Sequence, residues 1–422
     1  MKISVIGLGY VGMCQAAGLA KSGHDVIGVD IDKKKIENIN NKIPPIYEKG
    51  LKELLIDVVP DKLQATNNLK EAVLKTDLSF ICVGTPSKKE GSMSMVQLKN
   101  VARDIGRAIK QKESKHYVIT KSTIVPGTSE EIVIKTIEEH SGKKFPDDFG
   151  VGMNPEFLRE GTAIIDFFNP DRIVIGSSDK DTVEIAEKIY REFNCAILKT
   201  SLKEAEMIKY ASNALLATKI SFINEIGNIC KKYNINTNLV AEGVGLDSRI
   251  SPKFLRSGIG FGGSCFPKDV NAIVYKATEL GYNPRLLRAV LEVNRDQPLK
   301  LLEILENHCP LKNKKIGVLG LTFKAGTDDI RESPALNTIK ELLMEEAELY
   351  IYDPKAMGKV KKIFPHLNYL DSAEKVIKKS EIILILTEWD EFKELDYGKK
   401  LVIDGKNVFN HSKPENYEGI CW

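Results

Sequence analysis

The chain has 422 residues, of which 42% are hydrophobic and 28% charged, and its 61 basic and 58 acidic side chains leave a net charge of +3. This composition excludes a disordered, collagenous or coiled-coil chain and describes a soluble protein of two or three domains. The near balance of charge gives no reason to expect a nucleic-acid partner. Seven cysteines without a C-x-x-C pair favour the reducing cytoplasm over a disulfide framework, and no metal site is predicted.

Strands and helices alternate in the N-terminal third of the sequence. The predicted strands, which are short and rich in β-branched residues, are 3–6, 25–29, 78–83 and 117–120. Helix-length segments separate them, which indicates a parallel sheet covered by helices. The uncharged stretch before Lys21 resembles a secretory signal, but three glycines interrupt it. No apolar run approaches the roughly 20 residues of a membrane span, so no membrane association is predicted.

The pattern changes after Thr200. The predicted helices of the middle region are 203–233, 269–280 and 284–308. Strand and helix alternation then returns, with strands predicted at 316–319, 349–352, 382–386 and 401–403. The predicted fold class is α/β, with two Rossmann-like domains at residues 1–200 and 309–422 joined by an all-α region at residues 201–308.

A glycine-rich turn follows the first strand. Gly7 permits the tight turn, Gly9 lets a pyrophosphate approach the backbone, and Gly12 lets the following helix pack on the strand. Asp30, at the end of the second strand, would accept hydrogen bonds from the ribose hydroxyls and repel a 2′-phosphate, so the expected cofactor is NAD and not NADP. Lys35 could add a cation near the adenosine or could be a solvated surface lysine.

One cysteine has the surroundings of a nucleophile. Cys265 precedes Pro267, which suits the first turn of a helix, so the thiol lies just ahead of a helix N-terminus and beside Lys268. Both features favour the thiolate. Asp269 lies one turn on and could accept or relay a proton. The competing interpretation is a small buried side chain without a chemical role.

Four motifs together resemble the nucleoside-diphosphate-sugar 6-dehydrogenases, the family that includes UDP-glucose and GDP-mannose 6-dehydrogenases. They are the N-terminal glycine turn, residues 154–161 (Asn-Pro-Glu-Phe-Leu-Arg-Glu-Gly), residues 262–269 (Gly-Gly-Ser-Cys-Phe-Pro-Lys-Asp), and residues 321–324 (Leu-Thr-Phe-Lys) with 331–334 (Arg-Glu-Ser-Pro). The resemblance implies oxidation of a sugar C6 alcohol to a carboxylate with two NAD molecules. It also implies that Cys265 forms a thiohemiacetal and then a thioester, which water hydrolyses.

The motifs and the resemblance together assign the site residues. The residues expected to act in catalysis are Cys265, Lys209, Asn213, Glu160, Asp269, Thr123 and Glu156. The residues expected to bind the cofactor are Gly7, Gly9, Tyr10, Val11, Gly12, Asp30, Lys35, Thr85, Thr123, Glu160, Lys268 and Arg331. The residues expected to bind the substrate are Glu156, Phe157, Leu158, Lys209, Asn213, Arg249, Phe254, Gly262, Lys324 and Lys406.

Two of these assignments depend on predicted helices. Lys209 and Asn213 lie four residues apart on the long helix, so they share a face and could hold the C6 oxygen together. Asn154 and the proline after it resemble an N-cap and a first-turn proline, which predicts a short helix ended by Gly161. That helix would place Glu156 and Glu160 on one face. The sequence does not divide the proton transfers between the glutamates and Asp269.

The C-terminal domain is expected to bind the nucleotide of the substrate. Lys324 would neutralise its pyrophosphate, and Arg331 resembles an arginine that reaches the cofactor. Lys406 stands where the family commonly has arginine, so it keeps the charge but loses the planar fork. Arg249 resembles an arginine that reaches the sugar across a subunit interface, with Phe254 beginning the loop over the sugar, which implies a homodimer or larger homo-oligomer.

Several substrates and activities remain open from sequence alone. Within the family the motifs favour the UDP-glucose branch, with GDP-mannose and UDP-N-acetylhexosamines as alternatives. A β-hydroxyacid-type dehydrogenase would transfer one hydride and would need neither Cys265 nor a third domain. A protein that binds NAD without catalysis is the remaining alternative. The NADH formed per sugar oxidised separates these three classes.

Overall fold

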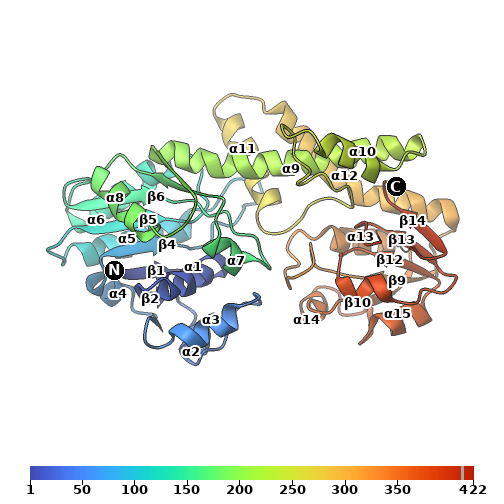
Figure 1. Cartoon of the computed structure of the whole chain (residues 1–422), viewed down its shortest axis with the longest axis horizontal. Helices are drawn as coiled ribbons and strands as arrows, with labels where there is room; N and C mark the ends of the chain where they lie inside the picture. Colours follow the sequence, from blue (N-terminus) through green and yellow to red (C-terminus); the bar gives the residue numbers. More distant parts are fainter. Residues whose placement is uncertain (410–412) are drawn as a thin grey trace. The chain divides into compact units, whose positions relative to one another are not determined.

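The structure is a computed structural model that describes residues 1–409 and 413–422. Its internal contacts divide the chain into two compact units, Met1–Ser212 and Asn213–Trp422. Each unit contains a largely parallel sheet flanked by helices, and the long helix α9 (Leu202–Lys232) carries residues of both units (Figure 1). The predicted α/β class with a central helical region is confirmed, whereas the predicted boundaries at residues 200 and 308 stay a prediction.

The first unit contains an eight-stranded sheet in the order β3-β2-β1-β4-β5-β6-β7-β8. Its strands are β1 (Lys2–Ile6), β2 (Asp25–Val29), β3 (Leu63–Thr66), β4 (Leu78–Ile81), β5 (His116–Thr120), β6 (Phe149–Met153), β7 (Arg172–Gly176) and β8 (Ala196–Thr200). All neighbours pair in parallel except β6 and β7, which meet at Met153 and Gly176 in antiparallel sense. The strand order reverses between β1 and β4, and ligands of doubly wound sheets bind at such a reversal.

Helices cover this sheet, and acidic or amide side chains define several of their starts. They are α1 (Tyr10–Lys21), α2 (Lys33–Asn40), α3 (Leu51–Val58), α4 (Leu69–Lys75), α5 (Val96–Ile109), α6 (Lys135–Ser141), α7 (Ala163–Phe168) and α8 (Lys180–Ile189), with a π-helical turn at Ser129–Ile134. Asp32, Asn68 and Asp179 accept backbone N–H bonds at the starts of α2, α4 and α8. These caps satisfy donors that the first helical turn leaves unpaired.

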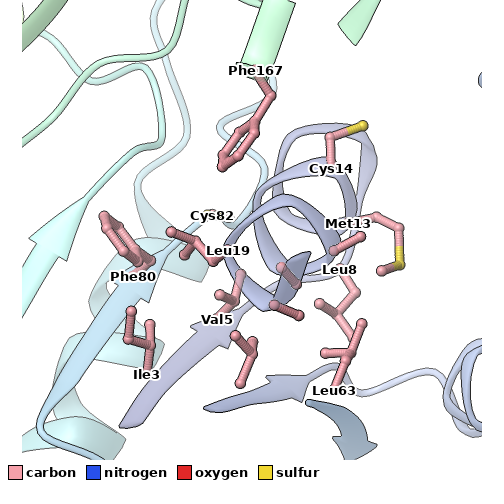
Figure 2. Close-up of a cluster of buried hydrophobic side chains, with 14 of the residues drawn as sticks. Ile3, Val5, Leu8, Met13, Cys14, Leu19, Leu63, Phe80, Cys82 and Phe167 are labelled. Atoms are coloured by element: carbon pink, nitrogen blue, oxygen red, sulfur yellow. The ribbon is translucent and has the colours of Figure 1, made fainter. Parts of the chain in front are cut away.

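Small residues let α1 sit deep in the core. Gly12 to Ala20 are all buried, and the ring of Phe167 from α7 packs directly over Gly18. Figure 2 shows side chains of this helix, among them Met13 and Leu19, in the apolar cluster that also contains Val5 of β1 and Leu8. The uncharged start of the chain thus forms the first strand and helix of the sheet. In the described part of the chain, no helix has the length and apolar character needed to span a bilayer.

The second unit contains a six-stranded parallel sheet in the order β11-β10-β9-β12-β13-β14. Its strands are β9 (Lys315–Leu319), β10 (Glu348–Tyr352), β11 (Asn368–Tyr369), β12 (Ile382–Ile385), β13 (Leu401–Asp404) and β14 (Asn416–Gly419). Its helices, besides the C-terminal part of α9, are α10 (Thr237–Gly245), α11 (Phe266–Glu279), α12 (Arg285–His308), α13 (Pro334–Met344), α14 (Met357–Val360) and α15 (Ala373–Lys379), with a 3-10 turn at Asp390–Glu394. As in the first sheet, the strand order reverses next to the first strand, here between β9 and β12, while all strands stay parallel.

Candidate active site

The glycine turn after β1 has the geometry that a bound pyrophosphate requires. Gly7 adopts φ +92° and donates its N–H to the Val29 carbonyl at 2.7 Å. A Cβ on Gly12 would lie 1.8 Å from the Gly7 oxygen, so only glycine lets α1 approach the turn. A Cβ on Gly9 would meet nothing within 4 Å. The backbone of Gly9 and the first turn of α1, with Tyr10 and the partly exposed Val11, therefore face open space where an anion fits.

Asp30 closes the other side of this turn at the end of β2. Its carboxylate accepts the N–H of Leu8 at 2.8 Å and that of Asp32 at 3.0 Å. Lys35 donates to the same carboxylate at 2.8 Å. Burial would raise the pKa of Asp30, but these hydrogen bonds and the lysine charge lower it. An ionised acceptor at this place suits ribose hydroxyls, and Lys35 pairs with Asp30 in this structure.

The loop after β5 carries Thr123, and two contacts fix the segment. The Thr85 hydroxyl, in the loop after β4, donates to the Thr123 carbonyl at 2.9 Å. Further along, the buried Glu206 of α9 accepts the N–H groups of Gly127 at 2.6 Å and Ser129 at 2.8 Å. We call these two bonds the Glu206 clasp. They tie the loop to the helix that carries Lys209, three residues on.

Glu156 and Lys209 form a buried ion pair in the first unit. The Lys209 Nζ donates to Glu156 Oε1 at 2.8 Å and to the Glu156 carbonyl at 2.7 Å. The side chains are only 7% and 4% exposed. Burial would raise the pKa of Glu156, but the charge and hydrogen bond of Lys209 and the N–H of Leu158 lower it. The carboxylate is therefore ionised, and it fixes the direction of the lysine.

The predicted helix at residues 154–161 is wrong. Residues 154–159 form a loop without regular secondary structure, and α7 begins only at Ala163. The Asn154 side chain does not cap a helix, because its amide donates to the Val174 carbonyl at 2.6 Å and its oxygen accepts the Tyr190 hydroxyl at 2.6 Å. These bonds to neighbouring elements outweigh the local preference for a cap. Glu156 and Glu160 therefore do not share a helix face.

The residues of this loop instead make separate contacts within the first unit. Phe157 stacks under the Arg172 guanidinium, whose carbon lies 3.7 Å from the ring centroid. The N–H of Leu158 bonds Glu156 Oε2 at 2.6 Å. Glu160 is half-buried, and Gly161 donates its N–H to the Tyr10 hydroxyl at 2.8 Å. The last bond joins the loop to the first residue of α1 in the nucleotide turn.

In the second unit, Cys265 occupies the N-cap of α11, as predicted. Its carbonyl accepts the N–H of Asp269 at 2.8 Å, and its half-buried sulfur lies 3.6 Å from the Ser264 hydroxyl. The buried Asp269 carboxylate accepts Asn213 Nδ2 at 2.6 Å and Lys268 Nζ at 2.5 Å. The thiol thus lies beside a helix N-terminus, which favours a thiolate.

The two glycines before Cys265 pack closely against the backbone of the segment that contains Arg331 and Glu332. A Cβ on Gly262 would lie 2.2 Å from the Glu332 oxygen, and Gly263 adopts φ +83°. Gly263 donates its N–H to the Arg331 carbonyl at 2.9 Å. The guanidinium of Arg331 pairs with Asp329 at 2.6 Å. The motif of residues 331–334 therefore supports the cysteine loop through the backbone.

Several residues of the second unit that were predicted to bind the substrate lie in loops. Lys324 and Lys406 were predicted to bind its nucleotide, and Arg249 and Phe254 its sugar. Lys406, after β13, donates to the Phe323 carbonyl at 3.0 Å, next to Lys324. Its Nζ also lies 3.5 Å from Glu388 Oε2. Phe254 has φ +65° and lies 6.2 Å from the Phe266 ring. Arg249 has an 87% exposed side chain that pairs with Asp247.

Comparison with known proteins supplies the family. Three models of the UDP-glucose/GDP-mannose dehydrogenase family match: the NAD binding domain at residues 1–194, the central domain at 203–296 and the UDP binding domain at 317–411. The chain belongs to this family. NAD is therefore its cofactor, and the open glycine turn with Asp30 fits that dinucleotide.

Relatives that carry the names of dehydrogenases match this chain over its whole length. The UDP-glucose 6-dehydrogenase AglM of Haloferax volcanii is 43% identical, and the GDP-mannose 6-dehydrogenase of Pseudomonas aeruginosa is 42% identical, with full coverage of both chains in each case. The solved UDP-glucose dehydrogenase of Pyrobaculum islandicum superposes with a TM-score of 0.96 at 40% identity, covering 100% of this chain and 97% of the other. The chain is an oxidoreductase of this family.

The Glu206 clasp is a feature of the site that sequence reasoning missed. Glu206 stands within an acidic run just before Lys209, which indicates a solvated helix start as readily as a buried carboxylate. Its partners, Gly127 and Ser129, lie about 80 residues earlier in the chain, and only the fold brings them to α9. The spacing of three residues to Lys209 was the one available signal.

Proposed function

We propose that this dehydrogenase oxidises the C6 alcohol of UDP-glucose to the carboxylate of UDP-glucuronate, with reduction of two NAD⁺. The observation that carries the proposal is Cys265 at the N-cap of α11, because a single hydride transfer needs no cysteine. The UDP-glucose dehydrogenases among its relatives support the choice of sugar nucleotide.

The proposed reaction has three stages. The C6 alcohol loses a proton and a hydride to give an aldehyde and the first NADH. The Cys265 thiolate adds to the aldehyde carbon while the aldehyde oxygen takes up a proton, which gives a thiohemiacetal. The thiohemiacetal then loses this proton and a second hydride, which the second NAD⁺ accepts, and a thioester is left. Water then breaks the carbon–sulfur bond, releasing the carboxylate and regenerating the thiol. NAD⁺ supplies the hydride acceptor in both oxidations.

The Glu156–Lys209 pair and the cysteine cluster supply different parts of this reaction. We assign Lys209 and Asn213 to the C6 oxygen, because an ammonium and an amide N–H₂ stabilise negative charge there. Asp269 accepts bonds from both Asn213 and Lys268, so it orients the first and takes up protons near Cys265. Glu160, Glu156 and Thr123 are assigned to proton transfer and to the hydrolytic water.

The remaining contacts are assigned to the two nucleotides. Gly7, Gly9, Tyr10, Val11, Gly12, Asp30, Lys35, Thr85, Lys268 and Arg331 are proposed to surround NAD. Phe157, Leu158, Arg249, Phe254, Gly262, Lys324 and Lys406 are proposed to surround UDP-glucose. Lys406 donates to a backbone carbonyl and approaches Glu388, so it offers a point charge to the substrate instead of the fork of an arginine.

We propose that the enzyme is a homodimer formed through its central helices. Leu215, Phe222 and Ile229 recur every seven residues along α9, with 62%, 48% and 49% of their surfaces exposed. A regular apolar stripe of this kind suits a second copy of the same helix. Light scattering tests the proposal: Phe222→Glu should give a monomer, and Ile363→Glu, at an equally exposed residue away from α9, should not.

We propose that the enzyme is cytoplasmic, because none of its seven cysteines forms a disulfide bond in the structure. Burial raises the pKa of Cys14, Cys82 and Cys421 to about 12, which keeps these three as neutral thiols. A chain with seven cysteines and no disulfide bond suits a reducing compartment.

The count of NADH per sugar tests the proposed reaction. Two equivalents of NADH per UDP-glucose support it, one equivalent would indicate a simple dehydrogenase, and none would indicate a binding protein. Cys265→Ser should bind NAD normally but release no UDP-glucuronate. Cys309→Ser, at another half-buried cysteine beside a helix end, serves as the control and should retain activity. Full turnover by Cys265→Ser would refute the thioester.

GDP-mannose is the second candidate substrate. The 42% identity to a GDP-mannose 6-dehydrogenase is nearly the same as that to the UDP-glucose enzyme, so overall similarity alone does not separate them. An assay of UDP-glucose, GDP-mannose and UDP-N-acetylhexosamines with NAD decides the question through the ratio of kcat/KM values. The proposal requires UDP-glucose to give the highest value.

A further inference from the structure

A buried lysine outside the proposed catalytic and binding residues lies at the carboxyl end of β5. Lys121 follows Thr120, which pairs in register with Ile81 of β4 and with Met153 of β6. Its own N–H donates to the Ile81 carbonyl at 2.8 Å. The residue is 7% exposed. Lys121 therefore lies at the edge of the sheet where the loops of the nucleotide turn, Thr123 and Glu156 begin.

Aromatic rings, and no close anion, surround the ammonium of Lys121. Its Nζ lies 6.0 Å from the centroid of Phe80 and 5.7 Å from that of Tyr190. The Tyr190 ring is fixed, because its hydroxyl donates to Asn154 at 2.6 Å and accepts from Gln15 at 3.2 Å. Within residues 1–409 and 413–422, no carboxylate oxygen lies within 4.0 Å of this Nζ. Burial of such a cation costs stability, and its retention calls for a reason.

The charges that face Lys121 come from three neighbouring elements. Burial lowers the pKa of Lys121 to about 8; Cys82 after β4 and Glu156 after β6 oppose this change, and Lys209 of α9 adds to it. Cys82 and Tyr190 are neutral near pH 7, because burial raises the pKa of both groups. The charges that remain are those of Lys121, Glu156 and Lys209.

We propose that Lys121 is a positioning residue that gives the buried Glu156–Lys209 pair a net positive charge. The inference rests on the proposed oxidation of UDP-glucose. An ammonium and a carboxylate in contact nearly cancel each other at a distance, so the pair alone stabilises a developing oxyanion weakly. A second ammonium leaves one positive charge in a buried site, where charge acts more strongly than in bulk water. Lys121 acts through Glu156 and Lys209 and does not contact the substrate.

The test compares Lys121→Met with Lys121→Arg across pH, using UDP-glucose and saturating NAD. Lys121→Met should lower kcat roughly tenfold at pH 7, because the positive charge that Lys121 adds to the Glu156–Lys209 pair is lost. The ratio of wild-type to Lys121→Met kcat should then fall toward one as pH rises through 8, since the wild type loses the same charge. Lys121→Arg should match the wild type at pH 7 and exceed it at pH 9, because its guanidinium stays charged.

Stability supplies a readout independent of activity. A lysine whose pKa is lower in the folded than in the unfolded state destabilises the fold while it is charged, below pH 8, and this penalty disappears as pH rises toward the unfolded value. Lys121→Met should therefore melt no lower than the wild type at pH 7. Lys112→Met, which removes another lysine whose pKa burial lowers and which bonds the Val73 carbonyl, is the control for the rate and should leave kcat unchanged.

Several results would overturn the proposal. They are an unchanged kcat in Lys121→Met at pH 7, or a reduced kcat whose ratio to the wild type stays constant with pH while the melting temperature falls, which would assign Lys121 to packing. If Lys121→Met does not fold, Lys121→Arg decides alone, and a fall at pH 9 equal to that of the wild type would overturn the proposal. A wild-type enzyme without NADH formation from UDP-glucose would refute the proposed function instead.

Discussion

The first sheet and the second sheet of this enzyme begin with the same turn. After β1, Gly7 donates to the Val29 carbonyl and Leu8 donates to Asp30 at the end of the neighbouring strand. After β9, Gly320 at φ +93° donates to the Tyr352 carbonyl at 2.9 Å, and Leu321 donates to Asp353 at 2.8 Å. In both sheets a glycine and an aspartate join the first strand to the second.

The two turns lead into different elements. In the first sheet α1 begins at Tyr10, directly after the exposed Gly9. In the second, a loop runs from Leu321 to the start of α13 at Pro334, so the next helix starts far along the chain from the turn. Asp353 is 1% exposed, and it also accepts the N–H of Lys355 and the indole N–H of Trp389. The turn and its aspartate thus connect the first two strands in both sheets. The difference is that α1 starts directly after the first turn, so its N-terminal N–H groups are available to a pyrophosphate there.

We expect the largest effect from a substitution that disrupts the first turn. Gly12→Ala places a Cβ 1.8 Å from the Gly7 oxygen, a backbone atom that cannot move aside cheaply. We expect it to lower the free energy of unfolding by about 3 kcal/mol or more and to abolish measurable NAD binding. Denaturant titration and fluorescence of bound NADH check both effects. Gly358→Ala, where a Cβ meets nothing within 4 Å, is the control and should change neither.

The second largest effect is expected at Asp353, where a substitution should change stability and leave NAD binding unchanged. Asp353→Asn turns an amide N–H₂ toward backbone N–H donors in a buried site. We expect a loss of about 2–3 kcal/mol in the free energy of unfolding, because buried donors are left without acceptors. NAD affinity should not change. A weaker NAD affinity in a folded Asp353→Asn enzyme would contradict the division of roles between the sheets.

The third prediction separates binding from folding within the first turn. Gly9→Ala should fold as well as the wild type, because the new Cβ meets no protein atom. It should raise the Kd for NAD about thirtyfold, or ~2 kcal/mol, by occupying the space that the pyrophosphate needs. Thermal unfolding and NAD titration measure the two quantities. A normal Kd would show that the pyrophosphate lies elsewhere.

The smallest effect sharpens the comparison of the two aspartates. Asp30→Asn keeps an oxygen for the Leu8 N–H but loses the charge that faces the ribose. We expect the Kd for NAD to rise about tenfold, or ~1.4 kcal/mol, and the preference for NAD over NADP to shrink, because the repulsion of a 2′-phosphate is removed. Its loss of stability should be smaller than that of Asp353→Asn. Equal losses would mean that both aspartates serve only as joints.

Much of the fold could be predicted from the sequence because local pattern and burial agree. The strand at Asp25–Val29 and the α12 terminus at His308 were predicted to the residue, and Cys265 is an N-cap as Pro267 indicated. The predicted helix at 154–161 failed for a physical reason. Asn154 has the residue type of a cap, but its partners are Val174 and Tyr190, which the sequence does not place nearby.

The sequence marks candidate site residues where chemistry requires an unusual residue, and it does not mark those whose surroundings depend on long-range contacts. The glycines of the first turn stand out because a side chain would clash or block a ligand there. Asp353 follows a strand as Asp30 does, so the sequence does not show that one is buried and the other partly exposed. Lys121 looks like any lysine after a strand, and its burial emerges only when the fold packs Phe80 of β4 and Tyr190 at the end of α8 around it.

The Glu206 clasp affects how the enzyme meets its substrate. A loop that bears functional groups usually loses conformational entropy when a ligand orders it, and this loss weakens binding. Here two N–H groups of the loop are already held by a carboxylate on α9, one turn from Lys209. The ordering therefore takes place once, when the chain folds, and need not be repeated in every catalytic cycle.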